Sequence, residues 1–295
     1  MRILNFGSLN IDYVYSVEHF VRPGETISAD AMQKFCGGKG LNQSAALARA
    51  GAQVYHAGCV GSDGRFLIEA LKASGVHTQY VAELDEPSGH AVIQVDARGQ
   101  NCILLYGGTN QRITDRQIDE VLSHFEAGDW LLLQNEVNNL PYVMEKAHKI
   151  GLKIAINPSP MNDKINVLPL ETVDLFFLNE IEGEALTKKQ DKDEIATRLL
   201  EKYPNASIVL TLGKQGAIYT DGQIEVFQPI IDAPVVDTTA AGDTFTGFFL
   251  QAVCEGKSPE EALKLATAAS AVAVSRKGAM PSIPTRAEAD ALAAK

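Results

Sequence analysis

The stretch DLFFLNEIEGEALTKKQDKDEIATRLLEKYPNASIVLTLG (174–213) decides the fold class. Its two short apolar runs, 174–179 and 207–213, end in small or polar residues, which is typical of buried parallel strands. The segments 180–187 and 192–202 between them have the polar and apolar periodicity of helices. A strand, helices and a second strand in this order predict one repeat of a parallel sheet.

The same alternation continues along most of the chain. Further strands are predicted at 2–8, 53–60, 129–134 and 153–157, and further helices at 39–50, 64–74, 114–125, 139–150, 241–255, 258–276 and 287–294. The pattern predicts an α/β fold, namely a doubly wound, mostly parallel sheet with helices on both faces. We expect one α/β domain over 1–295, because no linker or repeat divides the chain.

Two segments, 11–36 and 89–106, have alternating strand patterns without partner helices. The letters ARGQ (97–100) predict a hairpin turn in the second segment. We expect these two insertions to form a small β-sheet that covers a site on the main domain as a lid. An antiparallel extension at the edge of the main sheet is the alternative.

The composition excludes several classes of protein. The chain has 26 basic and 37 acidic residues, a net charge of −11, which argues against a nucleic-acid partner. Four cysteines without C-x-x-C spacing predict neither a disulfide framework nor a zinc site. The N-terminus lacks the pattern of a signal peptide, and no apolar stretch approaches 18 residues. We therefore expect a cytoplasmic protein without a membrane partner.

Polar residues follow the predicted strands where a ligand would bind. In an open parallel sheet, ligands bind beyond the carboxyl ends of the strands. Asp12 follows the first strand, and CGGKGLNQSAALARAGA (36–52) places glycines and Lys39 at a helix start. Further polar groups follow later strands: QNE (134–136), NPSP (157–160), NEIE (179–182) and TLGKQG (211–216). Each group alone could cap a helix, but together they predict a site.

Two nucleotide-binding motifs are incomplete. A Walker A loop is excluded because Gly40 follows Lys39 and the four-residue spacing is missing. In GCVGSDG (58–64), Val60 occupies the place of the middle glycine of a dinucleotide fingerprint. Asp63 is then expected to cap a helix. These observations argue against a dehydrogenase.

The stretch DTTAAGDTF (237–245) precedes an apolar run, 247–253, that predicts a buried helix. Asp243 would lie in the first turn of this helix. One interpretation is helix capping, which these residues alone favour. The other is that small residues let an anion reach the free backbone N–H groups.

From Gly7 to about Pro284 the chain resembles the ribokinase-like carbohydrate kinase family. The resemblance rests on GGKGLNQSAALARAGA (37–52) and DTTAAGDTFTGFF (237–249), with PGET (23–26), NPSP, N-x-x-E (179–182) and RKGAMPSIP (276–284) in the same order. It implies ATP-dependent phosphorylation of a small sugar at a primary hydroxyl, with D-ribose as the first expectation and D-ribose 5-phosphate as its product.

The resemblance also implies roles for individual residues. Asp243 would be the base, and the backbone of Ala240, Ala241 and Gly242 would form an anion hole. The sugar hydroxyls would be bound by Asp12, Gly38, Lys39, Asn42, Glu136 and Asp243. Asn179, Thr211 and Gly213 would bind ATP, and the helix near Thr267 would form a wall of the adenine pocket.

Two metal sites and an assembly follow from the same resemblance. Glu182 would organise Mg²⁺ through water. A K⁺ site would involve Asp237, Thr239, Ala273, Gly278 and Ser282. Such kinases dimerise through the lid, so a homodimer is expected.

Three departures from the family pattern leave alternatives open. They are Ile11, beside Tyr13, together with Thr109 and Thr246; the first two are expected near the sugar and weaken the assignment of ribose. The alternatives are a kinase of another sugar or of a nucleoside, and a sugar-binding protein without activity.

Overall fold

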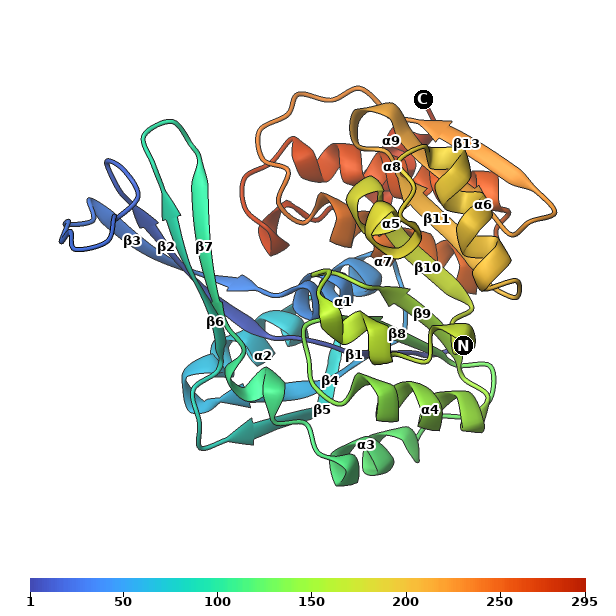
Figure 1. Ribbon diagram of the computed structural model, residues 1–295, viewed down its shortest axis with the longest axis horizontal. Coiled ribbons are helices and arrows are strands. Elements are labelled where there is room, and N and C mark those ends of the chain that lie inside the picture. Colours follow the sequence, from blue (N-terminus) through green and yellow to red (C-terminus); the bar gives the residue numbers. More distant parts are fainter.

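The computed structural model describes all residues, 1–295, as a nine-stranded sheet with helices on both faces and a separate four-stranded sheet (Figure 1). The large sheet has the order β13-β12-β11-β10-β9-β8-β1-β4-β5. Its strands from β5 to β11 are parallel, whereas β12 and β13 are antiparallel to their neighbours. The predicted α/β fold is therefore confirmed. The strands are β1 (Ile3–Phe6), β4 (Val54–Gly61), β5 (His77–Leu84), β8 (Trp130–Gln134), β9 (Lys153–Asn157), β10 (Leu175–Asn179), β11 (Ser207–Thr211), β12 (Gly216–Thr220) and β13 (Glu225–Pro229).

The sequence patterns missed three strands, β5, β12 and β13, all at the two ends of the large sheet. β5 and β13 are each paired on one side only. Their side chains are therefore largely exposed or half-buried, and they lack the continuous apolar run of the central strands.

The expected cap at Asp63 is also wrong. Helix α2 (Arg65–Ala73) has no side-chain cap, and the Asp63 carboxylate instead accepts hydrogen bonds from the N–H and hydroxyl of Ser88.

Each central strand is buried on both faces, so its side chains alternate between two hydrophobic cores. In β8, Trp130 and Leu132 belong to one core and Leu131 and Leu133 to the other. The first core is completed by α1 (Lys39–Arg49), α2, α7 (Ala241–Cys254), α8 (Pro259–Val274) and α9 (Arg286–Ala293). The second is completed by α3 (Asp115–Leu122), α4 (Leu140–Ile150) and α6 (Lys192–Lys202).

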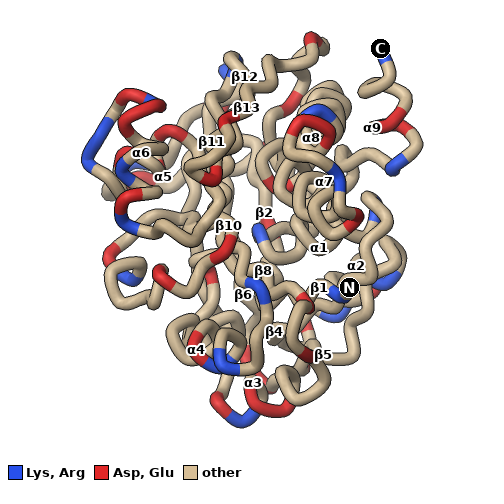
Figure 2. The backbone as a smooth tube through the Cα atoms, turned by 90° about the vertical axis from the view of Figure 1, so that its right-hand side faces the viewer, with Lys and Arg blue, Asp and Glu red and all other residues tan.

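The charged residues of α5 (Glu180–Thr187) are all acidic, whereas acidic and basic residues are mixed along α6 (Figure 2). Exposed ion pairs such as Arg198–Glu201 add little to stability, because water screens both charges. The two apolar cores therefore provide most of the stabilisation that holds the sheet and its helices together.

No helix is both long and apolar enough to cross a membrane.

The second sheet is built from two separate chain segments, as predicted. It contains β2 (Asn10–Ser16), β3 (Ala31–Gly37), β6 (Gly89–Val95) and β7 (Asn101–Tyr106), in the order β3-β2-β6-β7. β2 and β6 are parallel, and the outer pairs are antiparallel. No strand pairing joins it to the large sheet, so the alternative of an edge extension is wrong. The four strands project from one side of the molecule (Figure 1).

Candidate active site

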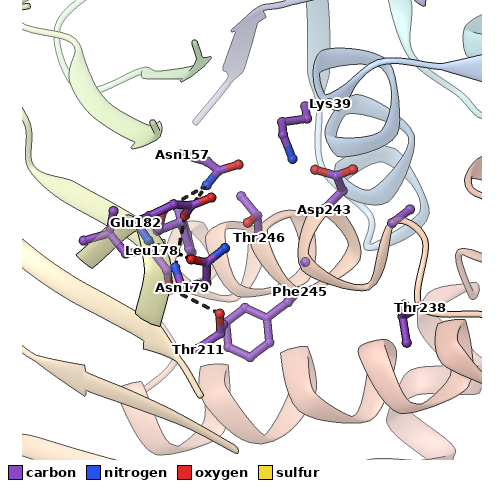
Figure 3. A pocket seen from close by; sticks show the side chains of 13 residues that line it. Lys39, Asn157, Leu178, Asn179, Glu182, Thr211, Thr238, Asp243, Phe245 and Thr246 are labelled. Atoms are coloured by element: carbon purple, nitrogen blue, oxygen red, sulfur yellow. Dashed lines mark hydrogen bonds between the residues drawn. The ribbon is translucent and has the colours of Figure 1, made fainter. Parts of the chain in front are cut away.

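A cavity of about 210 Å³ lies between the start of α7, the start of α1 and the carboxyl ends of β9, β10 and β11. Its position agrees with the rule that ligands bind beyond the carboxyl ends of parallel strands. Figure 3 shows the side chains of α1 and α7 on one side of this space and those of β10 and α5 on the other. Seven of the 13 lining residues are among those named from the sequence: Lys39, Asn179, Glu182, Thr211, Ala240, Gly242 and Asp243.

The first turn of α7 presents free backbone donors to this cavity. Ala240, its N-cap, has the left-handed backbone conformation, with φ of 59°, and makes no side-chain cap. The N–H groups of Gly242 and Asp243 have no hydrogen-bond partner in the protein. A Cβ atom added at Gly242 would meet nothing within 4 Å. This helix start therefore has the space and the donors that bind an anion.

The carboxylate of Asp243 does not cap the helix on which it lies. It points away from those N–H groups and accepts hydrogen bonds from Asn42 Nδ2 at 3.0 Å and from Gln43 Nε2 at 2.9 Å. Asp243 is buried, and the Asn42 Oδ1 atom beside it has no partner. Helix capping is therefore the wrong interpretation of this aspartate. Its two amide donors fix a carboxylate at the floor of the cavity.

Two further carboxylates lie beside the start of α1. Glu136 Oε2 accepts hydrogen bonds from the Ser8 hydroxyl and from the Lys39 N–H, the latter at 3.0 Å. Burial raises the pKa of the Glu136 carboxyl. Burial and the nearby charge of Glu136 raise the pKa of Asp12 to about 6. The structure thus brings Asp12, Glu136 and the α1 backbone together, as the resemblance predicted for a sugar site.

The glycines at the start of α1 allow the helix to approach the end of β1. Gly38, the N-cap, has φ of 95°, which side chains disfavour. At Gly40 an added Cβ atom would lie 2.3 Å from the Ser8 nitrogen, so a larger residue cannot occupy this position without a shift. The close approach places the side chain of the intervening Lys39 in the cavity.

The Lys39 ammonium is the cation of this site. Figure 3 shows its side chain directed into the cavity toward the region of Asp243. Burial by itself lowers the pKa of this ammonium, but three carboxylates outweigh burial and the pKa is raised; they belong to Asp243, Glu136 and Glu182. Lys39 is therefore charged at neutral pH. It lines the part of the cavity that contains Asn179 and Glu182, and Asp12 and Glu136 are not lining residues there.

The N-x-x-E residues form a capping box at the start of α5. Asn179 Oδ1 accepts from the Glu182 N–H at 2.8 Å, and Glu182 Oε2 accepts from the Asn179 N–H at 3.0 Å. Glu182 Oε1 has no protein partner and is available to a water on a hard cation. Thr211 also lines the cavity, with its hydroxyl bonded to the Leu178 carbonyl at 3.2 Å. Neither Gly213 nor Thr267 lines it.

The residues expected to hold K⁺ lie around the loop that precedes α7. The Asp237 carboxylate accepts from Thr239 N–H and from Gly278 N–H, each at 2.9 Å. The Ser282 hydroxyl donates to the Ala279 carbonyl at 2.7 Å. The Ala273 carbonyl accepts from Arg276 N–H at 3.1 Å. The candidate ligands are all oxygen atoms, which suits a hard cation rather than a soft metal.

Two departures from the family pattern do not face the cavity. Ile11 is fully buried in the first hydrophobic core, and Thr109 is buried with its hydroxyl bonded to the Cys59 carbonyl at 3.1 Å. If these two residues affect sugar recognition, they do not do so by contacting a ligand in this cavity. Thr246 does line the cavity.

The sequence patterns missed four polar residues of the site. Gln43 is buried and bonds Asp243, Gln134 is buried and bonds Gln43, Asn157 lines the cavity, and Ser8 bonds Glu136. Gln43, Gln134 and Asn157 stand in stretches that the sequence already indicated as parts of a site, at the helix start and at two strand ends, but no individual role followed for them. The pattern indicates that a polar residue lies at a strand end but not which residue it contacts.

Several known proteins resemble this chain in sequence and in structure. The profile of the pfkB family carbohydrate kinases matches residues 2–286. The ribokinase of Haemophilus influenzae is 35% identical over 292 residues, covering 96% of this chain and 95% of the relative. A deoxyribokinase of Salmonella typhi is 31% identical over 294 residues, covering 97% and 96%. The structure of Arabidopsis thaliana ribokinase complexed with ribose and ATP has a TM-score of 0.87, with 34% identity, and the match covers 99% of this chain and 98% of that one.

Proposed function

This chain belongs to the pfkB family of carbohydrate kinases, and on that basis we propose that it transfers the γ-phosphoryl group of ATP to the 5-hydroxyl of D-ribose. The observation that supports this most strongly is the placement of a buried carboxylate, Asp243, beside free N–H groups at a helix start. Phosphoryl transfer requires mainly positioning and charge stabilisation, and these groups provide both.

Asp243 acts as the base in this proposal. Its carboxylate accepts the proton of the attacking 5-hydroxyl, while the amides of Asn42 and Gln43 hold it in place. The transition state of phosphoryl transfer is loose, so most of the proton transfer occurs late and a carboxylate suffices. The N–H groups of the Ala240–Gly242 turn and of Asp243 bind the transferring phosphoryl oxygens. The oxyanions that develop there gain from fixed donors that need no reorganisation.

The sugar is held by the groups beside α1. Asp12 and Glu136 accept hydrogen bonds from its hydroxyls, and the unpartnered Asn42 Oδ1 accepts another. Gly38 and Lys39 contribute the backbone that approaches the sugar closely. Asn42 is buried and Asp12 and Glu136 are half-buried, so a bound hydroxyl replaces water that would otherwise satisfy these acceptors.

The nucleotide occupies the side of the cavity formed by Asn179, Thr211 and, farther out, Gly213 and Thr267. Glu182 would hold Mg²⁺ through water, and a bound Mg²⁺ would neutralise charge on the ATP phosphates. The oxygen set of Asp237, Thr239, Ala273, Gly278 and Ser282 suits K⁺, which would stiffen the loop that precedes α7. The chain's own contribution there is the bond from Gly278 N–H to Asp237, which ties this loop to the segment after α8.

The four-stranded sheet serves as a lid over the sugar and as the interface of a homodimer. Six large apolar side chains on it are exposed: Met32, Phe35, Ile103, Leu104, Leu105 and Tyr106. Four of them are consecutive on β7, and exposed apolar side chains concentrated in this way are typical of interaction surfaces. The four cysteines are free thiols, which suits a reducing cytoplasm.

A purified sample assayed for ADP release with ATP, Mg²⁺ and K⁺ tests this function. The panel contains D-ribose, 2-deoxy-D-ribose, other pentoses, hexoses and nucleosides. We expect D-ribose to give the highest kcat/KM, because Asp12 and Glu136 can accept bonds from several hydroxyls at once. A higher kcat/KM for 2-deoxy-D-ribose would favour the activity of the Salmonella relative instead. Binding of sugar without turnover of any panel member would favour a sugar-binding protein.

The acid limb of the ribose kcat/KM profile should report the titration of Asp12. Its pKa is raised to about 6, so the carboxyl is protonated below that pH in the free enzyme. A protonated carboxyl accepts fewer hydroxyl hydrogen bonds, so kcat/KM should fall as the pH decreases, about tenfold between pH 7.5 and pH 5. Steady-state kinetics over this range check the prediction. In Asp12→Asn the limb near pH 6 should disappear; a limb of unchanged position in that variant would assign it to another group.

A further inference from the structure

Gln43 bonds the carboxylate of Asp243 but does not itself line the cavity. Its side chain is fully buried, and it is absent from the cavity wall. One amide hydrogen of Nε2 bonds Asp243 Oδ1 at 2.9 Å and the other bonds Asn157 Oδ1 at 3.3 Å. Its Oε1 atom accepts from Gln134 Nε2 at 2.6 Å. Every polar atom of this amide is therefore used within the protein.

Asn157 extends the contact to the other side of the cavity. Its Nδ2 atom donates to Glu182 Oε2 at 3.3 Å and to the Phe177 carbonyl at 3.1 Å. The Gln43 amide thus joins the carboxylate proposed as the base to the carboxylate proposed to organise Mg²⁺. These two residues lie on different helices, α7 and α5, on opposite sides of the cavity.

The orientation of the Gln43 amide is set by a buried chain of donors that starts at His56. His56 Nε2 lies 3.2 Å from the Gly7 carbonyl, which can only accept, so Nε2 has the hydrogen. Burial lowers the pKa of His56 to about 4, so at neutral pH its Nδ1 has no hydrogen. Nδ1 therefore accepts from the Ser44 hydroxyl at 2.8 Å.

The next links all run in one direction. The Ser44 oxygen accepts from Asn5 Nδ2 at 2.8 Å, and Asn5 Oδ1 accepts from Gln134 Nε2 at 3.1 Å. The second hydrogen of Gln134 Nε2 goes to Gln43 Oε1. The reversed Gln43 amide would place an NH₂ group against the NH₂ of Gln134 and an oxygen against Asp243. The chain of hydrogen bonds excludes that arrangement.

We infer that Gln43 is a positioning residue, which holds Asp243 and, through Asn157, Glu182 in one fixed arrangement for phosphoryl transfer. The inference rests on the proposed function, in which Asp243 is the base and Glu182 organises Mg²⁺. Without the amide, the Asp243 carboxylate loses one of its two donors and the link to the metal side is broken. Groups that orient catalytic ligands in this way typically change activity or metal affinity by about 10–100-fold when removed.

The main test is Gln43→Met, which keeps the side-chain length and removes the amide. We expect kcat with saturating D-ribose and ATP to fall about 10–100-fold, with the ribose KM within about threefold of the unmodified protein. Half-maximal activation should also need more free Mg²⁺, because Glu182 loses its link to Gln43. The matched control is Gln251→Met on α7, where the amide bonds only Glu255 and all three quantities should stay unchanged.

A second variant covers the case in which Gln43→Met does not fold. Gln43→Glu keeps an acceptor for Gln134 but places a carboxylate against Asp243. Its kcat should be low at pH 8 and rise toward pH 6, because the introduced carboxyl then gains a proton and again offers a donor. A purely structural role would give this variant the pH profile of the unmodified protein, and that result would overturn the inference.

Asp243→Asn, assayed in parallel, separates the two levels of the account. If Asp243→Asn is inactive while Gln43→Met keeps a kcat within about twofold, the positioning role alone is wrong. If Asp243→Asn remains active, or if the unmodified protein does not phosphorylate D-ribose, the proposed function fails and the positioning role fails with it.

Discussion

Replacing Asp243 by asparagine is expected to lower kcat for sugar phosphorylation by about 10³-fold, within the range that a general base contributes. The substitution keeps the shape of the side chain, but the amide cannot accept the hydroxyl proton. In the unmodified protein, Asn42 Nδ2 donates to one oxygen of the Asp243 carboxylate and Gln43 Nε2 donates to the other. The asparagine NH₂ group replaces one of these oxygens and therefore faces one of the two donors. The ribose KM should change by only a few-fold, because Asp12 and Glu136 still bind the sugar. Steady-state kinetics with D-ribose and ATP measure both quantities.

The matched control for this substitution is Asp193→Asn. Asp193 is exposed on α6, and its carboxylate contacts only Lys192, at 3.1 Å. Its kcat should equal that of the unmodified protein. A small loss in Asp243→Asn, of tenfold or less, would mean that the carboxylate orients the sugar and that another group accepts the proton. An unchanged melting temperature shows that the loss is not caused by unfolding.

Replacing Lys39 by methionine is expected to lower kcat by about 10²–10³-fold, as expected for removal of a fixed charge that faces the transition state. The ammonium lines the cavity near Gly242 and Asp243, where the transferring phosphoryl group would lie. Methionine has a similar length without the charge, so the cavity keeps its shape. The negative charge that spreads over the phosphoryl oxygens would then be stabilised by the backbone N–H groups and the bound Mg²⁺, without the side-chain cation.

The separate changes in kcat and in the ribose KM distinguish the two possible roles of Lys39. A phosphoryl contact lowers kcat and leaves the ribose KM nearly unchanged, whereas a sugar contact raises the ribose KM. The control is Lys146→Met on α4, whose ammonium pairs with Asp119 at 2.8 Å on the surface. A raised ribose KM with an unchanged kcat in Lys39→Met would place this side chain with the sugar, contrary to the phosphoryl role.

The central architecture could be predicted from the sequence because its strands are buried on both faces. Runs such as KIAIN (153–157) and DLFFLN (174–179) are almost continuously apolar, which is typical of strands buried in the middle of a parallel sheet. The strands at the ends of the sheet lack this signal. β12 and β13 are joined by a short turn that contains Asp221-Gly222, a pair typical of hairpins, and that signal was available but not used.

The site could be predicted only in part, for a physical reason. Positions at strand ends and helix starts follow from the order of elements, so Asp12, Lys39 and Asp243 could be named as candidates. The partner of a side chain depends on tertiary contacts between distant segments. Asp63 could serve as a cap by its spacing but bonds Ser88, and Asp243 could cap α7 but bonds α1. In both cases a neighbour far along the chain offered a better donor than the local backbone.

The most direct test of the account is to identify the phosphorylated product by ³¹P NMR after incubation of the purified protein with D-ribose, ATP and Mg²⁺. The account predicts one ADP for each D-ribose 5-phosphate formed, no phosphorylation of 5-deoxy-D-ribose, and loss of the product signal in Asp243→Asn. Phosphate attached to any other hydroxyl of ribose, or ATP that stays intact in the presence of ribose, would contradict it.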